Sequence, residues 1–210
     1  MKLISRNQVF EKQNNLAKLI RRFQKDCFDE EYDNLENETF DILIFDLQEI
    51  EYESFILEVN HKDLETYTKT ISKKLIKLLE VSNTKELTLI SHLKLDFFEG
   101  IEYLEDVRIL ENYSKLSKII NLKKYNEAIT IELSEVETFF EIFFWMNIGN
   151  QISEFIFWSD LENKYCFNIC KYGKLHFIDF TNGNLISNKD LKILGFNKIK
   201  TKCSDGIMLK

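Results

Sequence analysis

The stretch that decides the fold is EFIFWSDLENKYCFNICKYGKLHFIDF, residues 154–180. It holds three short runs rich in apolar and aromatic residues, separated by SDLEN and by KYG, and this pattern predicts a three-stranded antiparallel meander. Gly173 suits the left-handed position of a three-residue turn with a bulge. That turn collects the large apolar side chains on one face of the meander. The predicted register sets Phe167 opposite Phe177 and Ile169 opposite Leu175.

The apolar pattern outside the meander predicts both strands and helices. Strands are expected at 40–46, 54–59, 86–91, 94–98 and 128–133, the first two flanking QEIEYE as a hairpin of interior strands. Helices are expected at 5–27, 62–81 and within 101–120, and at 134–149, where Ser134 and Glu137 have the spacing of a capping box. A short helix should begin at 187–190 and end at Gly195.

This order of elements predicts an α+β fold, with a mainly antiparallel sheet and helices packed on one face. The chain has 210 residues, no proline and six glycines, so it lacks the Pro- or Gly-rich linkers that separate domains. We therefore expect a single α+β domain over 1–210, with 121–127 as a candidate point of subdivision.

The composition also predicts where the protein works. The first residues, MKLISRNQVFEKQ, lack the apolar core of a signal peptide, and the most apolar run, 139–148, is too short to span a membrane. Four cysteines are too few for a disulfide scaffold. We expect a cytoplasmic protein without a membrane partner, and the richness in Lys, Asn and Ile suggests a bacterial source or a bacterial mobile element.

The motifs of common enzymes are missing from the chain. Its glycines stand 10 to 49 residues apart, which excludes a phosphate-binding loop, a dinucleotide fingerprint and a GxSxG elbow. Cys166 and Cys170 share one face of a predicted strand with His176, but four strand residues span about 13 Å, too far for two thiolates to hold one zinc ion. The sequence predicts core cysteines, no metal and no cofactor, and gives no pattern that assigns catalysis to His61, His92 or His176.

A metal-dependent nuclease stays open as an alternative, because such enzymes hold Mg²⁺ with carboxylates on sheet strands. Asp41, Asp46 and Glu58 lie on or beside predicted strands and would have to converge. Glu162-x-Lys164 also fits such sites, but it falls in a predicted turn, where it is more simply solvated. Direct nucleic-acid binding is not expected from a chain with a pI of about 5.2, although residues 1–28 and 189–210 are basic.

The acidic residues are segregated in what we name the acidic segment, residues 29–65. It carries 14 Asp or Glu and one Lys, a net charge of −13, whereas the other 173 residues of the chain sum to +6. Such a field can steer a basic partner, and closely spaced carboxylates can imitate a phosphate backbone. The partner-binding residues predicted from the outward-facing parts are Asp29, Glu30, Glu31, Asp33, Glu36, Glu49, Glu51 and Glu53.

These observations predict a non-catalytic module that binds a basic protein partner, such as an immunity protein that neutralises a nuclease-type toxin. The alternatives are the metal-dependent nuclease and a structural or regulatory protein of a phage or mobile element. The acidic segment has its own simpler explanation, since charges on loops and strand edges also suppress aggregation. The sequence leaves the partner, the oligomeric state and the sheet order undetermined.

Overall fold

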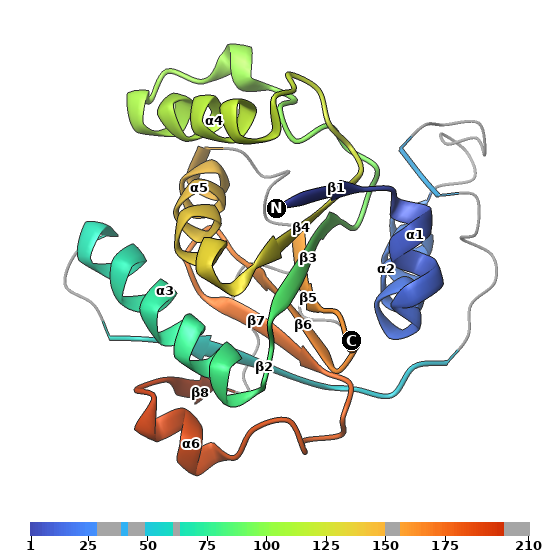
Figure 1. Ribbon diagram of the computed structural model, residues 1–210, viewed down its shortest axis with the longest axis vertical. Helices are drawn as coiled ribbons and strands as arrows, with labels where there is room; N and C mark the ends of the chain where they lie inside the picture. The colour runs from blue at the N-terminus through green and yellow to red at the C-terminus, as the bar shows by residue number, and fades with distance from the viewer. Residues whose placement is uncertain (29–38, 42–48, 61–63, 150–155, 200–210) are drawn as a thin grey trace.

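The protein is built around one antiparallel sheet, and the computed structural model describes residues 1–28, 39–41, 49–60, 64–149 and 156–199 (Figure 1). Eight strands of this part join the sheet in the order β1-β4-β3-β5-β6-β7-β2-β8. The strands are β1 Lys2–Ile4, β2 Glu53–Glu58, β3 Glu86–Ser91, β4 Ala128–Glu132, β5 Ile156–Asp160, β6 Tyr165–Ile169, β7 Leu175–Asp179 and β8 Asn197–Ile199. The α-helices are α1 Arg6–Lys12, α2 Asn14–Cys27, α3 Leu64–Val81, α4 Val107–Ile120, α5 Val136–Gly149 and α6 Asn188–Ile193, with single 3-10 turns η1 at Ile101–Tyr103 and η2 at Leu133–Glu135. The predicted α+β fold with a mainly antiparallel sheet is confirmed.

The meander forms as the sequence predicts. Strands β5, β6 and β7 are neighbours, and Phe167 pairs with Phe177. Ile169 pairs with Leu175, so the register is the predicted one. Gly173 has a φ of +74°, the left-handed conformation that the three-residue turn requires.

Gly173 also lies against the core, which makes it a position where a single methyl group should be costly. A Cβ there would overlap the Tyr67 ring and come within 2.7 Å of Phe144 Cε2. We expect Gly173→Ala to lower the free energy of unfolding by about 2–5 kcal/mol, since left-handed strain costs about 1–2 and overpacking about 1–3 kcal/mol. Urea denaturation followed by circular dichroism measures the loss.

Gly183 provides the matched control, because its φ of +84° carries the same backbone strain without a core neighbour. A Cβ at Gly183 meets only the Glu53 carboxylate, at 2.9 Å. Gly183→Ala should therefore cost about 1–2 kcal/mol, the strain alone. Equal losses in the two variants would contradict the close packing at Gly173.

One face of the sheet packs against α3, α4 and α5. Trp158 and Phe167 of the sheet are buried in the same cluster as Leu75 of α3, Leu116 of α4 and Phe140 of α5. The helix α5 is apolar nearly all round because it lies between the sheet and the two neighbouring helices, as its sequence predicts.

The opposite face packs against α1 and α2, which we call the N-terminal helix pair (Figure 1). Ile90, Phe157 and Ile178 point to this face and form a cluster with Leu19 and Phe23 of α2. The predicted packing of helices on one face thus describes α3, α4 and α5, and the N-terminal helix pair adds a layer on the other face. The sheet is consequently buried on both faces, which explains why its strands are apolar runs with little alternation.

The single helix predicted over 5–27 is divided in two. It breaks at Gln13, whose backbone angles of −118° and 75° are not helical. The Gln13 side chain is buried and donates from Nε2 to the Thr88 hydroxyl of β3 at 2.7 Å. This bond fixes the N-terminal helix pair to the sheet at the point where the two helices meet.

Two local predictions are wrong. Residues 94–98 form an irregular stretch that leads into a turn and not a strand, because Asp96 accepts hydrogen bonds from the amides of Phe98 and Tyr125. Ser134 does not open a capping box, since the reciprocal bonds are made two residues earlier, by Glu132 and Glu135 around η2. In both places short-range polar contacts outweigh the apolar or capping pattern.

The acidic segment contributes an interior strand to the sheet. The strand predicted at 54–59 is β2, which lies between β7 and β8. Its predicted hairpin partner at 40–46 falls mostly outside the described residues.

Strands that precede and follow residues 121–127 join the same sheet. Among the helices that the structure describes, none has both the length and the apolar character needed to cross a membrane.

Candidate functional site

The eight predicted partner-binding residues divide into two groups. Five lie outside the described residues: Asp29, Glu30, Glu31, Asp33 and Glu36. Glu49 and Glu51 are exposed on the stretch that leads into β2, and no described residue forms an ion pair with either of them. Glu53, the first residue of β2, is half-buried.

The exposure of Glu49 and Glu51 has a packing cause. Ile50 and Tyr52 alternate with them and pack against the cluster under the N-terminal helix pair. Burial raises the pKa of the Tyr52 hydroxyl, and nearby Arg22 of α2 opposes that rise. Two apolar anchors therefore turn the two glutamates outward and hold the backbone between them against the fold.

Glu53 is held within the fold. Its carboxylate accepts from the Lys198 ammonium of β8 at 3.1 Å, and the same ammonium lies 3.8 Å from the centre of the Phe55 ring. Glu58, at the other end of β2, faces Lys174 at 3.5 Å. The acidic residues on the strand itself thus neutralise neighbouring lysines, and the outward charge is found in the stretch before it.

Asp41 belongs to a buried polar network. Arg6 is 1% exposed, and its guanidinium donates to both carboxylate oxygens of Asp41, at 2.6–3.1 Å, and to the Ser91 carbonyl at 2.7 Å. Gln24 of α2 donates to Asp41 at 2.7 Å and accepts from the Asp41 amide at 3.1 Å. The network fixes the described residues 39–41 of the acidic segment to the N-terminal helix pair and to the end of β3.

The carboxylates predicted to hold a metal ion in a nuclease do not converge in the described part of the structure. Asp41 is bound at the end of β3, whereas Glu58 lies on β2, four strand intervals away in the sheet. At about 4.8 Å per interval the separation is about 19 Å, far beyond a shared metal ion. Asp46 lies outside the described residues. Within the described ranges, no group of three or more His, Cys, Asp or Glu is placed to hold a metal.

The cysteines behave as the sequence predicts. Cys166 is buried among the residues under the N-terminal helix pair, and its burial raises the pKa of the thiol far above the ordinary value. Cys170 is buried beside Ile56 at the other end of the same face. Asn168 pairs with His176 in the β6–β7 register, so His176 shares that face as predicted.

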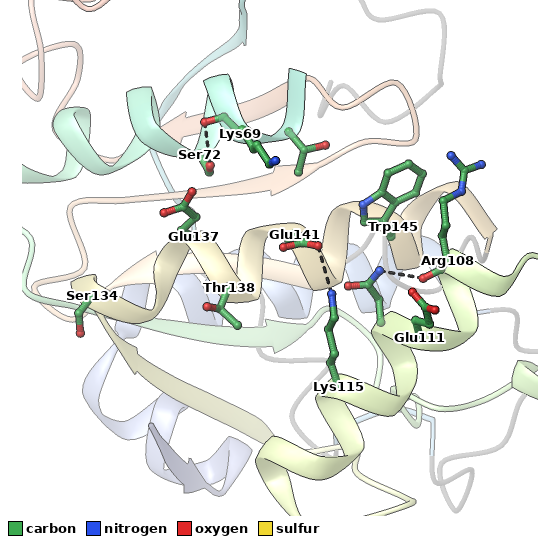
Figure 2. Close-up of a pocket in the computed structure, with 12 residues that line it drawn as sticks. Lys69, Ser72, Arg108, Glu111, Lys115, Ser134, Glu137, Thr138, Glu141 and Trp145 are labelled. Atoms are coloured by element: carbon green, nitrogen blue, oxygen red, sulfur yellow. Dashed lines mark hydrogen bonds and ion pairs between the residues drawn. The ribbon is translucent and has the colours of Figure 1, made fainter. Parts of the chain in front are cut away.

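A second candidate site is a groove in the helical layer, which the sequence did not predict. We call it the helix groove; its volume is about 480 Å³, and Figure 2 shows that α3, α4 and α5 all contribute side chains. It is lined by Thr68, Lys69, Ser72, Arg108, Glu111, Asn112, Lys115, Ser134, Glu137, Thr138, Glu141 and Trp145. The lining contains three cations and three anions, so its formal charge is zero.

Some charged residues of the helix groove have a partner within the fold and others do not. Lys115 of α4 pairs with Glu141 of α5 at 3.2 Å, and the Arg108 guanidinium lies 4.7 Å from the centre of the Trp145 ring. Lys69 of α3, Glu111 of α4 and Glu137 of α5 form no ion pair with any described residue. The groove therefore carries one unpaired cation and two unpaired anions.

Asn112 supplies an unusual polar atom in the α4 wall of the helix groove. The residue is 3% exposed, and its Nδ2 donates to the Arg108 carbonyl at 2.8 Å. Its buried Oδ1 accepts no hydrogen bond from the described part of the chain. Leaving such an acceptor unsatisfied costs about 1–3 kcal/mol, a cost that the fold carries at this position.

The sequence held one signal for this groove. Glu137, Thr138 and Glu141 interrupt an otherwise apolar helix at positions that share one side of α5. The residues of α3 and α4 that complete the groove are far apart in the chain, and nothing local connects them. Comparison with models of protein families, with curated proteins and with solved structures finds no match for this chain.

Proposed function

We propose that this chain is a non-catalytic binding module that docks a basic protein through the acidic segment, residues 29–65. In its finer form the proposal is an immunity protein that neutralises a basic, nuclease-type toxin in the bacterial cytoplasm. The single observation that carries it is the outward, unpaired placement of Glu49 and Glu51 on a stretch anchored from beneath by Ile50 and Tyr52.

Anchoring matters because a partner then gains charge contacts without first having to order the backbone that carries them. The segment is held at two described places, by Arg6 and Gln24 at Asp41 and by packing at Ile50 and Tyr52. Both places lie against the N-terminal helix pair. The segment carries a net charge of −13 in 37 residues, and the exposed Glu49 and Glu51 present part of that charge where it can steer a basic protein.

We narrow the proposal to the acidic residues that have no ion-pair partner among the described residues. Glu53 already neutralises Lys198, so a partner would have to break that ion pair to use it. Glu49 and Glu51 need no such exchange. Among the described members of the predicted set, we therefore assign docking to Glu49 and Glu51 and a supporting role to Glu53.

The test uses any basic protein that is encoded by a gene next to that of this chain. If that protein is a nuclease, the chain should inhibit it stoichiometrically, and Glu49→Lys with Glu51→Lys should raise the half-inhibitory concentration by at least about tenfold. Glu53→Gln alone should have a smaller effect, because its charge is balanced within the fold. Full inhibition by the doubly reversed variant would overturn the assignment of the docking site.

A further inference from the structure

We propose that the helix groove binds a small zwitterion, of the class of a free amino acid or a dipeptide. This goes beyond the proposed docking of a basic protein and depends on none of its residues. It rests on the shape of the groove and on the balance of its charges.

The size of the groove suits a small molecule. A volume of about 480 Å³ lies within the range of about 300–1,000 Å³ that small-molecule sites occupy. Its lining is mostly polar, which favours a ligand held by hydrogen bonds and charge over an apolar one. The floor is α5, and α3 and α4 form the walls, so the groups that would contact a ligand are fixed on three packed helices (Figure 2).

The charges select the class of ligand. A polyanion would meet Glu111, Glu137 and Glu141, and a polycation would meet an equal number of lining cations. A ligand with one ammonium and one carboxylate suffers neither repulsion. Lys69 and Glu137 provide the two complementary charges, because no described residue neutralises either of them and Glu137 points toward the helix that bears Lys69 (Figure 2).

Figure 2 shows Glu137 pointing from α5 toward α3, which bears Lys69 and Ser72. A ligand carboxylate would lie at Lys69 and its ammonium at Glu137. The other ion pair of the groove, Lys115 with Glu141, closes the α4 side and needs no ligand.

The test uses the intact chain and isothermal titration calorimetry with individual proteinogenic L-amino acids and glycyl dipeptides as probes. We expect saturable binding of at least one free zwitterion. Its N-acetylated and carboxyl-amidated forms, which each lack one charge, should bind at least about tenfold more weakly. Binding that is absent for every probe, or that is unchanged by capping either end, would overturn the proposal.

Variants separate the groove from the rest of the surface. Lys69→Met and Glu137→Gln should each weaken binding by at least about tenfold. Lys73→Met on the same helix and Glu105→Gln before α4 are exposed, lie outside the lining, and should bind as the wild type does. Equal weakening in these controls would contradict a site in the groove.

Because Lys69 and Glu137 are both exposed, their substitutions test the groove without disturbing the core.

Discussion

Arg6→Leu should lower the free energy of unfolding by about 3–5 kcal/mol, the loss expected when one member of a buried ion pair is removed. The Arg6 side chain is 2% exposed and that of Asp41 is 11% exposed. Among the described residues, the substitution leaves the Asp41 carboxylate with Gln24 as its remaining side-chain donor and deprives the Ser91 carbonyl of its guanidinium donor. Urea denaturation of the two proteins at the same pH and ionic strength measures the difference.

A double-mutant cycle distinguishes the ion pair from the packing of Arg6. Arg6→Leu with Asp41→Leu should recover part of the loss, because no buried carboxylate is then left uncompensated. The exposed pair of Lys115 and Glu141 is the control, and Lys115→Met should cost about 0–1 kcal/mol. An Arg6→Leu loss in that same low range would show that the network is not buried as described.

Trp158→Ala should cost a similar amount, about 3–5 kcal/mol, because it removes the largest buried side chain of the sheet. Trp158 is 1% exposed, pairs with Phe167 on β6 and stacks on its ring at a centroid distance of 5.7 Å. It also meets Phe143 of α5 edge to face at 5.9 Å. Its removal leaves a cavity between the meander and α5 that these aromatic neighbours cannot close.

The control for Trp158 is an aromatic residue without a core role. Tyr103 is 82% exposed, and Tyr103→Ala should change the free energy of unfolding by no more than about 0.5 kcal/mol. Both variants are compared by urea denaturation with tryptophan-independent detection, such as far-ultraviolet circular dichroism. Similar losses at the two positions would contradict the central place of Trp158.

The elements that the sequence predicted well are those set by neighbouring residues. The register of β6 and β7 follows from the turn at Gly173, and the strand at 86–91 and the helix ending at Gly149 follow from apolar patterns with clear ends. The sheet order could not be predicted, because β3 pairs with β4 and β5 across long stretches of chain. Such pairings depend on the whole core.

The sequence predicted the docking site of the acidic segment only through its concentration of charge. The alternation of Glu49 and Glu51 with Ile50 and Tyr52 was legible in the sequence, and the structure adds what the apolar pair packs against. The burial of Arg6 could not be predicted from the sequence, because an arginine in an amphipathic helix ordinarily faces water. Its partner Asp41 lies 35 residues away, and no local pattern links the two.

The most direct test of acidic docking is the association rate with the basic partner, measured by stopped-flow fluorescence at low and physiological ionic strength. Glu49→Lys with Glu51→Lys should slow association at low salt by at least about tenfold and weaken its salt dependence, because steering comes from these charges. Reversal of Glu102 and Glu105, which are equally exposed outside the acidic segment, should leave the rate near that of the wild type. An unchanged rate after reversal of Glu49 and Glu51, or an equal slowing in the control, would contradict the account.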